Sequence, residues 1–576
     1  MERRQAFGPV RRMAEATLLM GALWAWPATG QTPTDTTQST SEQRRAQERD
    51  ARQRDQALRE REQRTQAAQA TPARRLLDAE SPCFPIHQIE LRGEDASRFS
   101  WVLDALTAPD GLDGPLRRCL GAGGIGILAQ RAQHAVVARG FVTSRVLVEP
   151  QDLSPGLLTL TVIPGRIRQV RFADPTARNA SAHHALPAQA GDILNLRDIE
   201  QALENFKRVP SAEADIQIVP ADEPGRSDLL IHWKQGRPVR MQLSVDDSGS
   251  RSTGRYQGGA TLSIDNPLSL NDLFYVGLQR SLGGGDPGAR GTSGSSWHYS
   301  LPWGRAWLGF DVSRHRYLQT VAGAAQDYAY RGTTGSQEAT LSYLVHRDAM
   351  SKTTLHAKAF ARQSRNFIDD TEVEVQRRRV GGWQLGVGHR AFVGPGTLDL
   401  NLSYRRGTGA FGSLRAPEEA FGEGTSRFAL VQANAQWQWP FKLGTQPWQY
   451  SGQWRAQAHR TPLAPQERFA IGGRHTVRGF DGESSLSAES GWIWRNELAT
   501  PLGASGTSAF VGLDHGQVHG PSARRIVGTR LTGAVVGLRG SAGGVQYELF
   551  AGWPVHKPEG FRTAHAALGF WLATGF

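Results

Sequence analysis

The residues best suited to one specific interaction are Val477-Arg478-Gly479-Phe480, in a glycine-rich stretch that begins at Ile471. An arginine next to a glycine and an aromatic residue usually marks no more than a turn. Here, however, the stretch lies between long alternating strands, and an arginine buried among such strands needs an acidic partner. Asp514 is the best candidate for that partner, so the sequence predicts a buried pair between Arg478 and Asp514.

The only two cysteines, Cys83 and Cys119, fall in the same early segment. In an exported chain, an even pair favours a disulfide over a metal site, which would need more ligands. The alternative is two free, buried thiols. We therefore expect one disulfide, no metal site and no cofactor.

Other motifs that could carry chemistry are weak. Residues 121–126 match G-x-G-x-x-G, but they do not follow a clear parallel strand, and no acidic residue lies about twenty positions further on. We interpret them as the entry to a helix. His183-His184 and Asp246-Asp247 are expected to be solvated loops or strand ends. The chain contains no G-x-S-x-G, H-E-x-x-H or G-x-x-x-x-G-K-[ST] motif, so an enzyme is the weakest class of function.

The net charge of +12, from 66 Lys and Arg against 54 Asp and Glu, is spread along the chain. No block of Lys and Arg stands out, so the charge favours a solvated mixed surface over a nucleic-acid site. Nucleic acid is not an expected partner.

The elements that must position the arginine are strands that run from about Val239 to the terminal Phe576. Apolar and polar residues alternate over about ten residues in each, which is the length that a tilted transmembrane strand requires. Three clear examples begin at Val239, Val431 and Trp448. Residues 237–576 therefore predict an all-β transmembrane barrel of about sixteen strands, although periodicity leaves fourteen or eighteen open.

The last residues place Leu568, Phe570, Leu572, Thr574 and Phe576 on one face. Phe576 is therefore expected to close the barrel against its first strand, which leaves no unpaired edge in lipid. Short turns such as 302–304 alternate with long Gly/Ser loops such as 283–296, as in outer-membrane barrels. A barrel of this size has a lumen that wall side chains do not fill, so a plug is needed.

The N-terminal region predicts export. Residues 1–30 are typical of a signal peptide, with arginines before a short apolar core and cleavage before Gln31. No apolar stretch of the length of a membrane helix follows. Residues 31–40 are expected to be flexible, and Ser41–Ala70 are rich in helix formers without an apolar face. This segment is either a plug in a polar lumen or a charged, partly disordered linker, and residues 71–80 act as a tether.

Residues 81–236 contain an internal repeat of two β-α-α-β-β units, 81–164 and 165–236. Each is long enough for a small domain. The predicted elements of the first unit are 86–91, 98–106, 125–139, 143–149 and 157–163, and those of the second are 167–172, 196–206, 214–219 and 228–233 with a short helix after the first strand.

Several stretches in this order resemble a known family, the outer-membrane transporters of two-partner secretion, which include FhaC and the haemolysin exporter ShlB. The stretches are 140–146, 151–156, 162–167, 194–201, 265–272, 472–480, 495–498 and 514–516. The resemblance runs from about residue 41 to the end. The cysteine pair is not something that the family requires.

The resemblance implies two periplasmic POTRA domains at 81–164 and 165–236, a sixteen-stranded barrel, and a lumen helix at 41–70. It also implies that Arg478 of the Val-Arg-Gly-Phe motif pairs with Asp514 of the barrel wall. The implied function is export, without ATP, of a large unfolded exoprotein that carries an N-terminal two-partner secretion domain. The implied location is the outer membrane of a Gram-negative bacterium, with membrane lipid and the barrel-assembly machinery as further partners.

Two other functions remain open from the residues. A barrel-assembly factor of the same superfamily would insert other barrels, although such factors usually carry more POTRA units. A porin-like channel would explain the strands but would leave residues 81–236 without a purpose.

Overall fold

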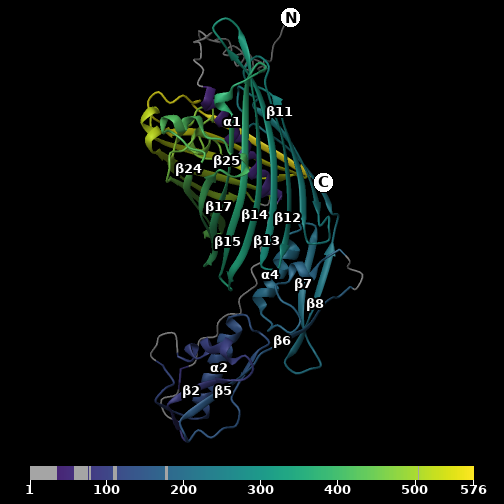
Figure 1. The fold of residues 1–576 in the computed structure, drawn as a ribbon. Helices are drawn as coiled ribbons and strands as arrows, with labels where there is room; N and C mark the ends of the chain where they lie inside the picture. The colour runs from purple at the N-terminus through teal and green to yellow at the C-terminus, as the bar shows by residue number, and fades with distance from the viewer. Residues whose placement is uncertain (1–34, 58–74, 77–79, 108–112, 175–178, 504) are drawn as a thin grey trace, which may run out of the picture.

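The computed structural model describes residues 35–57, 75–76, 80–107, 113–174, 179–503 and 505–576. A closed barrel forms the upper part, a helix lies inside it, and two α+β domains hang from one end (Figure 1). The predicted signal peptide and residues 58–70 of the predicted helix lie outside the described residues. Among the helices that the structure describes, none combines the length and apolar character needed to cross a bilayer.

The first α+β domain has a core of two short sheets and one long helix. The elements are β1 (Phe84–Ile86), β2 (Gln88–Arg92), two 3-10 helices (Ala96–Val102 and Asp104–Leu106), β3 (Arg118–Leu120), α2 (Ala122–Ala138), β4 (Arg145–Leu147) and β5 (Leu157–Ile163). Strand β5 pairs with β2 in parallel and with β4 in antiparallel, and α2 packs its apolar stripe on this sheet. The pair β1–β3 was not predicted, because each strand has only three residues.

The second α+β domain repeats this plan next to the barrel. It contains β6 (Arg166–Phe172), α3 (Ala182–Ala185), α4 (Leu196–Lys207), β7 (Ala212–Pro220) and β8 (Arg226–Gln235), in the sheet order β6-β8-β7. Asn195 caps α4 because its side chain accepts a hydrogen bond from Arg197 N. Helix α4 places Ile199, Ala202 and Phe206 in the core.

Sixteen antiparallel strands close the barrel, which is the number that the family resemblance implies and lies within the range that the alternation left open. They are β9 (Val239–Asp246), β10 (Tyr256–Asp265), β11 (Leu273–Gly283), β12 (Gly291–Trp303), β13 (Ala306–Ala322), β14 (Asp327–Arg347), β15 (Ser351–Ile368), β17 (Arg378–Val393), β18 (Gly396–Thr408), β19 (Ala429–Leu443), β20 (Gln446–His459), β23 (Ser490–Pro501), β24 (Thr507–His519), β25 (Arg530–Ala542), β26 (Val545–His556) and β27 (Ala567–Gly575). A two-residue strand, β16 (Thr371–Glu372), adds to the end of β15.

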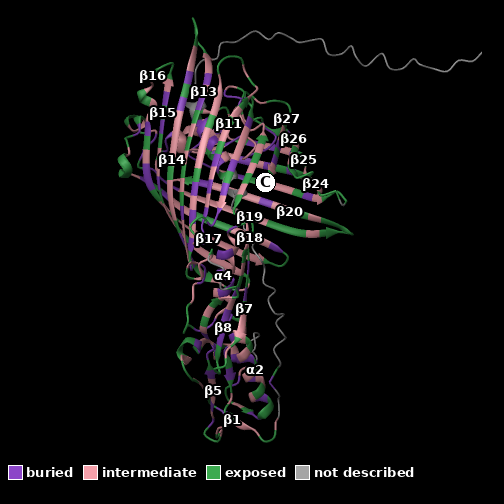
Figure 2. Ribbon diagram, turned by 90° about the vertical axis from the view of Figure 1, so that its right-hand side faces the viewer, coloured by how far each residue is buried: buried purple, intermediate pink, exposed green. Residues whose placement is uncertain are grey.

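Burial alternates along the barrel strands (Figure 2). In β9, apolar residues at odd positions face outward and are exposed, while the residues between them are half-buried toward the lumen. The chain end closes the ring: Met241 N donates to Phe576 O, and Phe576 N donates to Met241 O. The predicted loop 283–296 was too long, because β12 begins at Gly291 and includes the Gly/Ser-rich second half of that stretch.

The helix α1 (Asp35–Ala57) lies within the barrel near β13 and the segment after β20 (Figure 1). It begins at Asp35 rather than Ser41, so the prediction of a flexible segment up to residue 40 was wrong. Thr and Ser each disfavour a helix by less than about 1 kcal/mol, and Gln is a good helix former, so this composition allows the helix to extend through residues 35–40.

Candidate functional site

The Val-Arg-Gly-Phe residues lie in a long segment that folds back into the lumen between β20 and β23. This segment contains two short paired strands, β21 (Phe469–Ile471) and β22 (Leu486–Ala488), and we call residues 472–485 between them the motif loop. Val477 and Phe480 are buried in an apolar cluster that β23, β24 and β25 complete. The ring of Phe480 meets that of Phe561 edge-on at 5.8 Å. This cluster fixes the loop on one side of the lumen.

Arg478 is bound to Asp514 of β24 through three hydrogen bonds. Its backbone N and its Nε both donate to Asp514 Oδ2, at 2.9 and 2.7 Å, and its Nη2 donates to Oδ1 at 2.8 Å. Asp514 is fully buried, and Arg478 is 8% exposed. A bidentate pair with so little solvent fixes both the position and the orientation of the loop.

A second carboxylate, Glu497 of β23, also binds this arginine. Arg478 Nη1 donates to Glu497 Oε2 at 2.5 Å, and Arg539 of β25 pairs with Glu497 Oε1 at 2.7 Å. Arg495 lies 3.7 Å from Asp514. This role of Glu497 was not predicted from the sequence, although the residue lies in the stretch 495–498 that carries the family resemblance.

Four glycines of the wall form the surface on which the motif loop lies. They face the lumen and occur on four successive strands. They are Gly512 of β24, Gly533 of β25, Gly552 of β26 and Gly569 of β27. A Cβ at Gly533 would meet the carbonyl oxygen of Arg478, and one at Gly552 would meet the Cα of Gly479. Gly479 itself has φ of +99°, which favours glycine. Only a wall without side chains here lets the loop approach so closely.

Helix α1 contacts both arms of the segment that carries the motif loop. Arg44 Nη2 donates to Pro465 O at 3.0 Å and to Ser487 Oγ at 2.9 Å. Arg45 Nη2 donates to Gly482 O, within the motif loop. The helix therefore rests on the loop through polar contacts.

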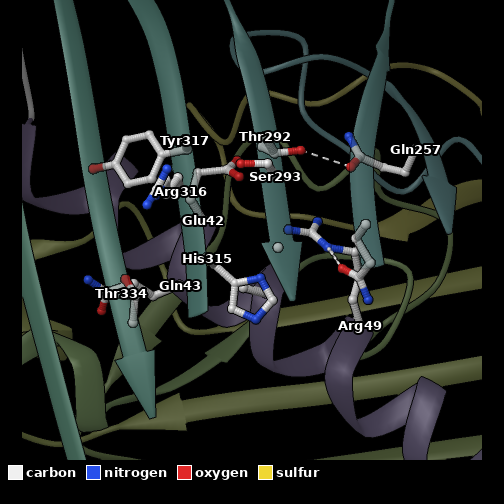
Figure 3. A pocket seen from close by; sticks show the side chains of 13 residues that line it. Glu42, Gln43, Arg49, Gln257, Thr292, Ser293, His315, Arg316, Tyr317 and Thr334 are labelled. Atoms are coloured by element: carbon white, nitrogen blue, oxygen red, sulfur yellow. Dashed lines mark hydrogen bonds between the residues drawn. The ribbon is translucent and has the colours of Figure 1, made fainter. Parts of the chain in front are cut away.

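The same helix faces the opposite wall across a narrow hollow (Figure 3). Asp50 Oδ2 lies 2.9 Å from His315 Nε2 of β13, and Arg49 Nε donates to Gln279 Oε1 at 3.2 Å. The hollow is lined by polar side chains such as Glu42 and Thr334. Such a surface suits a polar helix that has no apolar stripe.

The second α+β domain is fastened to the near end of the barrel by α4. Arg347 Nη1 donates to Glu204 Oε2 at 2.6 Å, Lys352 Nζ donates to Glu204 Oε1, and Asn205 Nδ2 donates to Gly304 O at 2.8 Å. Burial alone would raise the pKa of Glu204, but Lys352 and Arg347 outweigh it, so the pKa lies below its usual value. The carboxylate therefore stays charged in this contact.

The structure joins Cys83 and Cys119 by a disulfide across the pair β1–β3. The G-x-G-x-x-G stretch is the start of α2, and the carboxylate of Glu80 accepts hydrogen bonds from Gly121 N and Gly124 N. A side chain of this chain thus occupies the place where a phosphate would bind.

The prediction that Asp246-Asp247 is solvated was wrong for Asp247. The Asp247 side chain is 5% exposed and is bound by Arg474 of the motif loop. His184 hydrogen-bonds Ser181 through Nδ1 at 2.7 Å and lies beside Trp303.

Comparison with known proteins explains this architecture. Residues 225–540 match the family described as haemolysin secretion/activation protein ShlB/FhaC/HecB, and residues 84–165 and 166–220 match POTRA domains, the first of the ShlB type. The chain belongs to the ShlB/FhaC/HecB family. The predicted family and fold class are therefore confirmed.

Several relatives of this ShlB/FhaC/HecB chain are named as transporters. It is 38% identical to the outer membrane transporter CdiB-2 of Burkholderia pseudomallei over 87% of this chain and 88% of the relative. It is 26% identical to the hemolysin transporter protein ShlB of Serratia marcescens over 80% of this chain and 79% of the relative. The solved structure of CdiB from Acinetobacter baumannii superposes with a TM-score of 0.81 at 28% identity, covering 95% of this chain and all of that one.

Membership of this family places the barrel in the outer membrane and the POTRA domains in the periplasm. The protein is an outer-membrane transporter of the two-partner secretion class, and its partners are large exoproteins.

Proposed function

We propose that this transporter captures one unfolded exoprotein with its POTRA domains and passes it through the barrel lumen after α1 has left. The observation that carries the proposal is the nature of the α1 contacts. The hydrogen bonds of Arg44, Arg45 and Arg49 and the contact of Asp50 with His315 are polar, and water or a passing chain can replace them at little cost. A helix held this way is a removable plug.

Capture requires free strand edges in the periplasm. In the second POTRA domain, β7 is an edge strand of nine residues. Residues 211 and 236 form a hydrogen-bonded pair, as do 221 and 226, so the backbone groups of Ala214 and Ile216 point away from β8. An extended segment of the exoprotein could pair with this edge by β-augmentation.

Movement through the lumen requires a fixed wall while the plug is out. We propose that the Arg478–Asp514 pair supplies it, with Val477, Gly479 and Phe480 seating the loop in its apolar and glycine-lined surface. We also propose that no step is enzymatic and that no nucleotide or other cofactor takes part, so the driving force comes from capture and from folding outside the cell. Lipid around the exposed apolar band, and the barrel-assembly machinery during insertion, are the other partners.

The test is a secretion assay in a porin-depleted host. The chain is co-expressed with a candidate exoprotein that carries an N-terminal two-partner secretion domain, and the exoprotein is measured in the medium and in the periplasm. Export that depends on the chain supports the proposal. If the exoprotein stays in the periplasm while assembly of other barrels improves, the chain is an assembly factor, and the proposal fails.

A further inference from the structure

The junction where the barrel closes, between β9 and β27, has a short backbone ladder. We call this junction the seam. Five residue pairs join the two strands, from Asp246–Trp571 to Gln242–Gly575, and the mutual bonds of Met241 and Phe576 extend the ladder by one. Residues 567–570 of β27 continue beyond the end of β9, and in the described chain they have no ladder partner in β9. Backbone pairing thus closes only the lower part of the seam.

Side chains close the upper part. Phe570 is the first residue of β27 above the ladder, and its backbone N donates a hydrogen bond to Asp247 Oδ1 at 2.9 Å. Arg255 Nη2 lies 3.4 Å from both Leu568 O and Asp247 Oδ2. Asp247 therefore takes the place of the missing β9 backbone.

Asp247 is in turn held by the motif loop. Arg474 Nη2 lies 2.5 Å from Asp247 Oδ1, and Arg474 Nη1 lies 3.9 Å from Asp246. The guanidinium also lies over the ring of Phe550 of β26, at 4.8 Å. A loop that β20 and β23 carry into the lumen thus reaches the first strand of the barrel.

The path of Arg474 depends on the fourth wall glycine. A Cβ at Gly569 would meet Arg474 Nη2, so the side chain can cross β27 only because this position has no side chain. The loop lies on β24, β25 and β26 through Arg478 and Gly479, and on β27 and β9 through Arg474. It spans the seam from inside.

We propose that Arg474 is a positioning residue that ties the motif loop to Asp247 and thereby keeps the upper seam closed. Arg478 anchors the loop to β24, on one side of the seam. Arg474 attaches the end of β9, on the other side of the seam, to that anchored loop. Closure of the upper seam then depends on a docked loop. This role concerns the barrel itself and does not rest on the identity or the route of any exported chain.

The test measures the unfolding temperature of the full-length protein on semi-native gels, on which folded and unfolded barrels migrate differently. Arg474→Ala, Asp247→Asn and the double variant are compared. Each single change is expected to lower the unfolding temperature. The double variant is expected to unfold at no lower temperature than the less stable of the two single variants. Asn keeps an oxygen for Phe570 N, so Asp247→Asn removes mainly the charge that Arg474 binds. Additive losses would overturn the proposal, because the two residues would then act independently.

A disulfide across the seam separates this role from a general loss of stability. Ser244 and Ala573 face the lumen as a non-hydrogen-bonded pair, since the pair 241–576 is hydrogen-bonded and pairs alternate. Replacing both by cysteine would link β9 to β27, and the native cysteines are already joined to each other. The matched control replaces Ser296 and Ser313, a lumen-facing pair of β12 and β13.

With the seam disulfide, the Arg474→Ala variant is expected to unfold at the same temperature as a protein that has this disulfide and the native Arg474. With the control disulfide, the Arg474→Ala variant is expected to remain less stable than its counterpart with Arg474. Gly533→Ala, which displaces the loop without touching Arg474, is expected to be rescued in the same way. Equal rescue by both disulfides, or no rescue by the seam disulfide, would overturn the proposal. A stable Arg474→Ala variant would overturn it as well.

Discussion

Arg478 and Asp514 are 36 positions apart in the chain, yet three hydrogen bonds join them, one of them from the backbone N of the arginine. The carboxylate thus holds the loop by its main chain as well as by its charge. Replacement of the arginine side chain would remove two of the three bonds and leave Asp514 and Glu497 without their shared cation.

We expect Arg478→Ala to abolish export while the barrel still assembles. Loss of one partner of a buried pair costs about 3–5 kcal/mol, and less where water reaches it. Arg478→Lys should recover only part of the export, because an ammonium group cannot make the bidentate contact. Secretion is measured in the medium, and folding is measured by heat-modifiable migration.

The matched control for this change is Arg390→Ala. Arg390 pairs with Asp399 in the same barrel, but the two side chains are 34% and 28% exposed, and exposed pairs contribute little. Normal export by the Arg478→Ala variant would contradict the role that we assign to the Arg478–Asp514 pair.

Much of this architecture could be predicted from the sequence. Strand alternation and the terminal Phe576 indicate a barrel because each strand carries the whole pattern in about ten consecutive residues. The arginine in a glycine-rich stretch required an acidic partner, and Asp514 was a candidate that the sequence offered.

The remaining parts depend on register, which short patterns do not encode. Gly512, Gly533, Gly552 and Gly569 lie under one loop only because four strands align them, so no single stretch marks them. Asp247 looked like a solvated strand end for the same reason: its partner Arg474 is 227 positions away.

Gly533→Ala tests whether the motif loop needs a wall without side chains. The new Cβ would meet the backbone oxygen of Arg478, and overpacking of this kind costs about 1–3 kcal/mol. We expect the loop to be displaced, export to fall and conductance in planar bilayers to rise. The matched control is Gly335→Ala on β14, where the nearest atom, Nε2 of the flexible Gln363 side chain, lies 3.3 Å from the new Cβ. Equal export and equal conductance of the two variants would show that the close approach of the motif loop to the wall is not needed for function.

The plug can be tested through Asp50. Asp50→Ala removes the contact with His315 and should raise the frequency of open-channel events, since the helix would lose its contact with β13. Gln47→Ala changes an exposed residue of the same helix and serves as control. Single-channel recordings in planar bilayers report both. An unchanged open frequency for Asp50→Ala would mean that α1 is held elsewhere.

Glu204 makes the contact between the second POTRA domain and the barrel sensitive to acid. Its pKa is lowered in the folded protein, because Lys352 and Arg347 outweigh the effect of burial. The carboxylate therefore stabilises the contact at any pH above its unfolded value of 4.5, and this stabilisation is lost as the pH falls from there toward the lower folded pKa. Further carboxylates of this contact are Glu200, 3.5 Å from Arg347, Asp198, 2.6 Å from Arg305, and Asp265, whose Oδ2 accepts a hydrogen bond from Ser211 N at 2.9 Å.

Spin labels at Glu213→Cys in the POTRA domain and Lys442→Cys near the end of β19 would report the contact. Both positions are exposed, and the native cysteines are joined in a disulfide. We expect the distance distribution to be narrow at pH 7 and to broaden below about pH 4.5. In Glu204→Gln the distribution should be broad at pH 7 already and change little with acid, whereas Glu223→Gln, an exposed change elsewhere in the domain, should behave as wild type. A Glu204→Gln variant whose distance distribution still broadens only in acid would assign the pH dependence to another carboxylate of this contact, and not to Glu204.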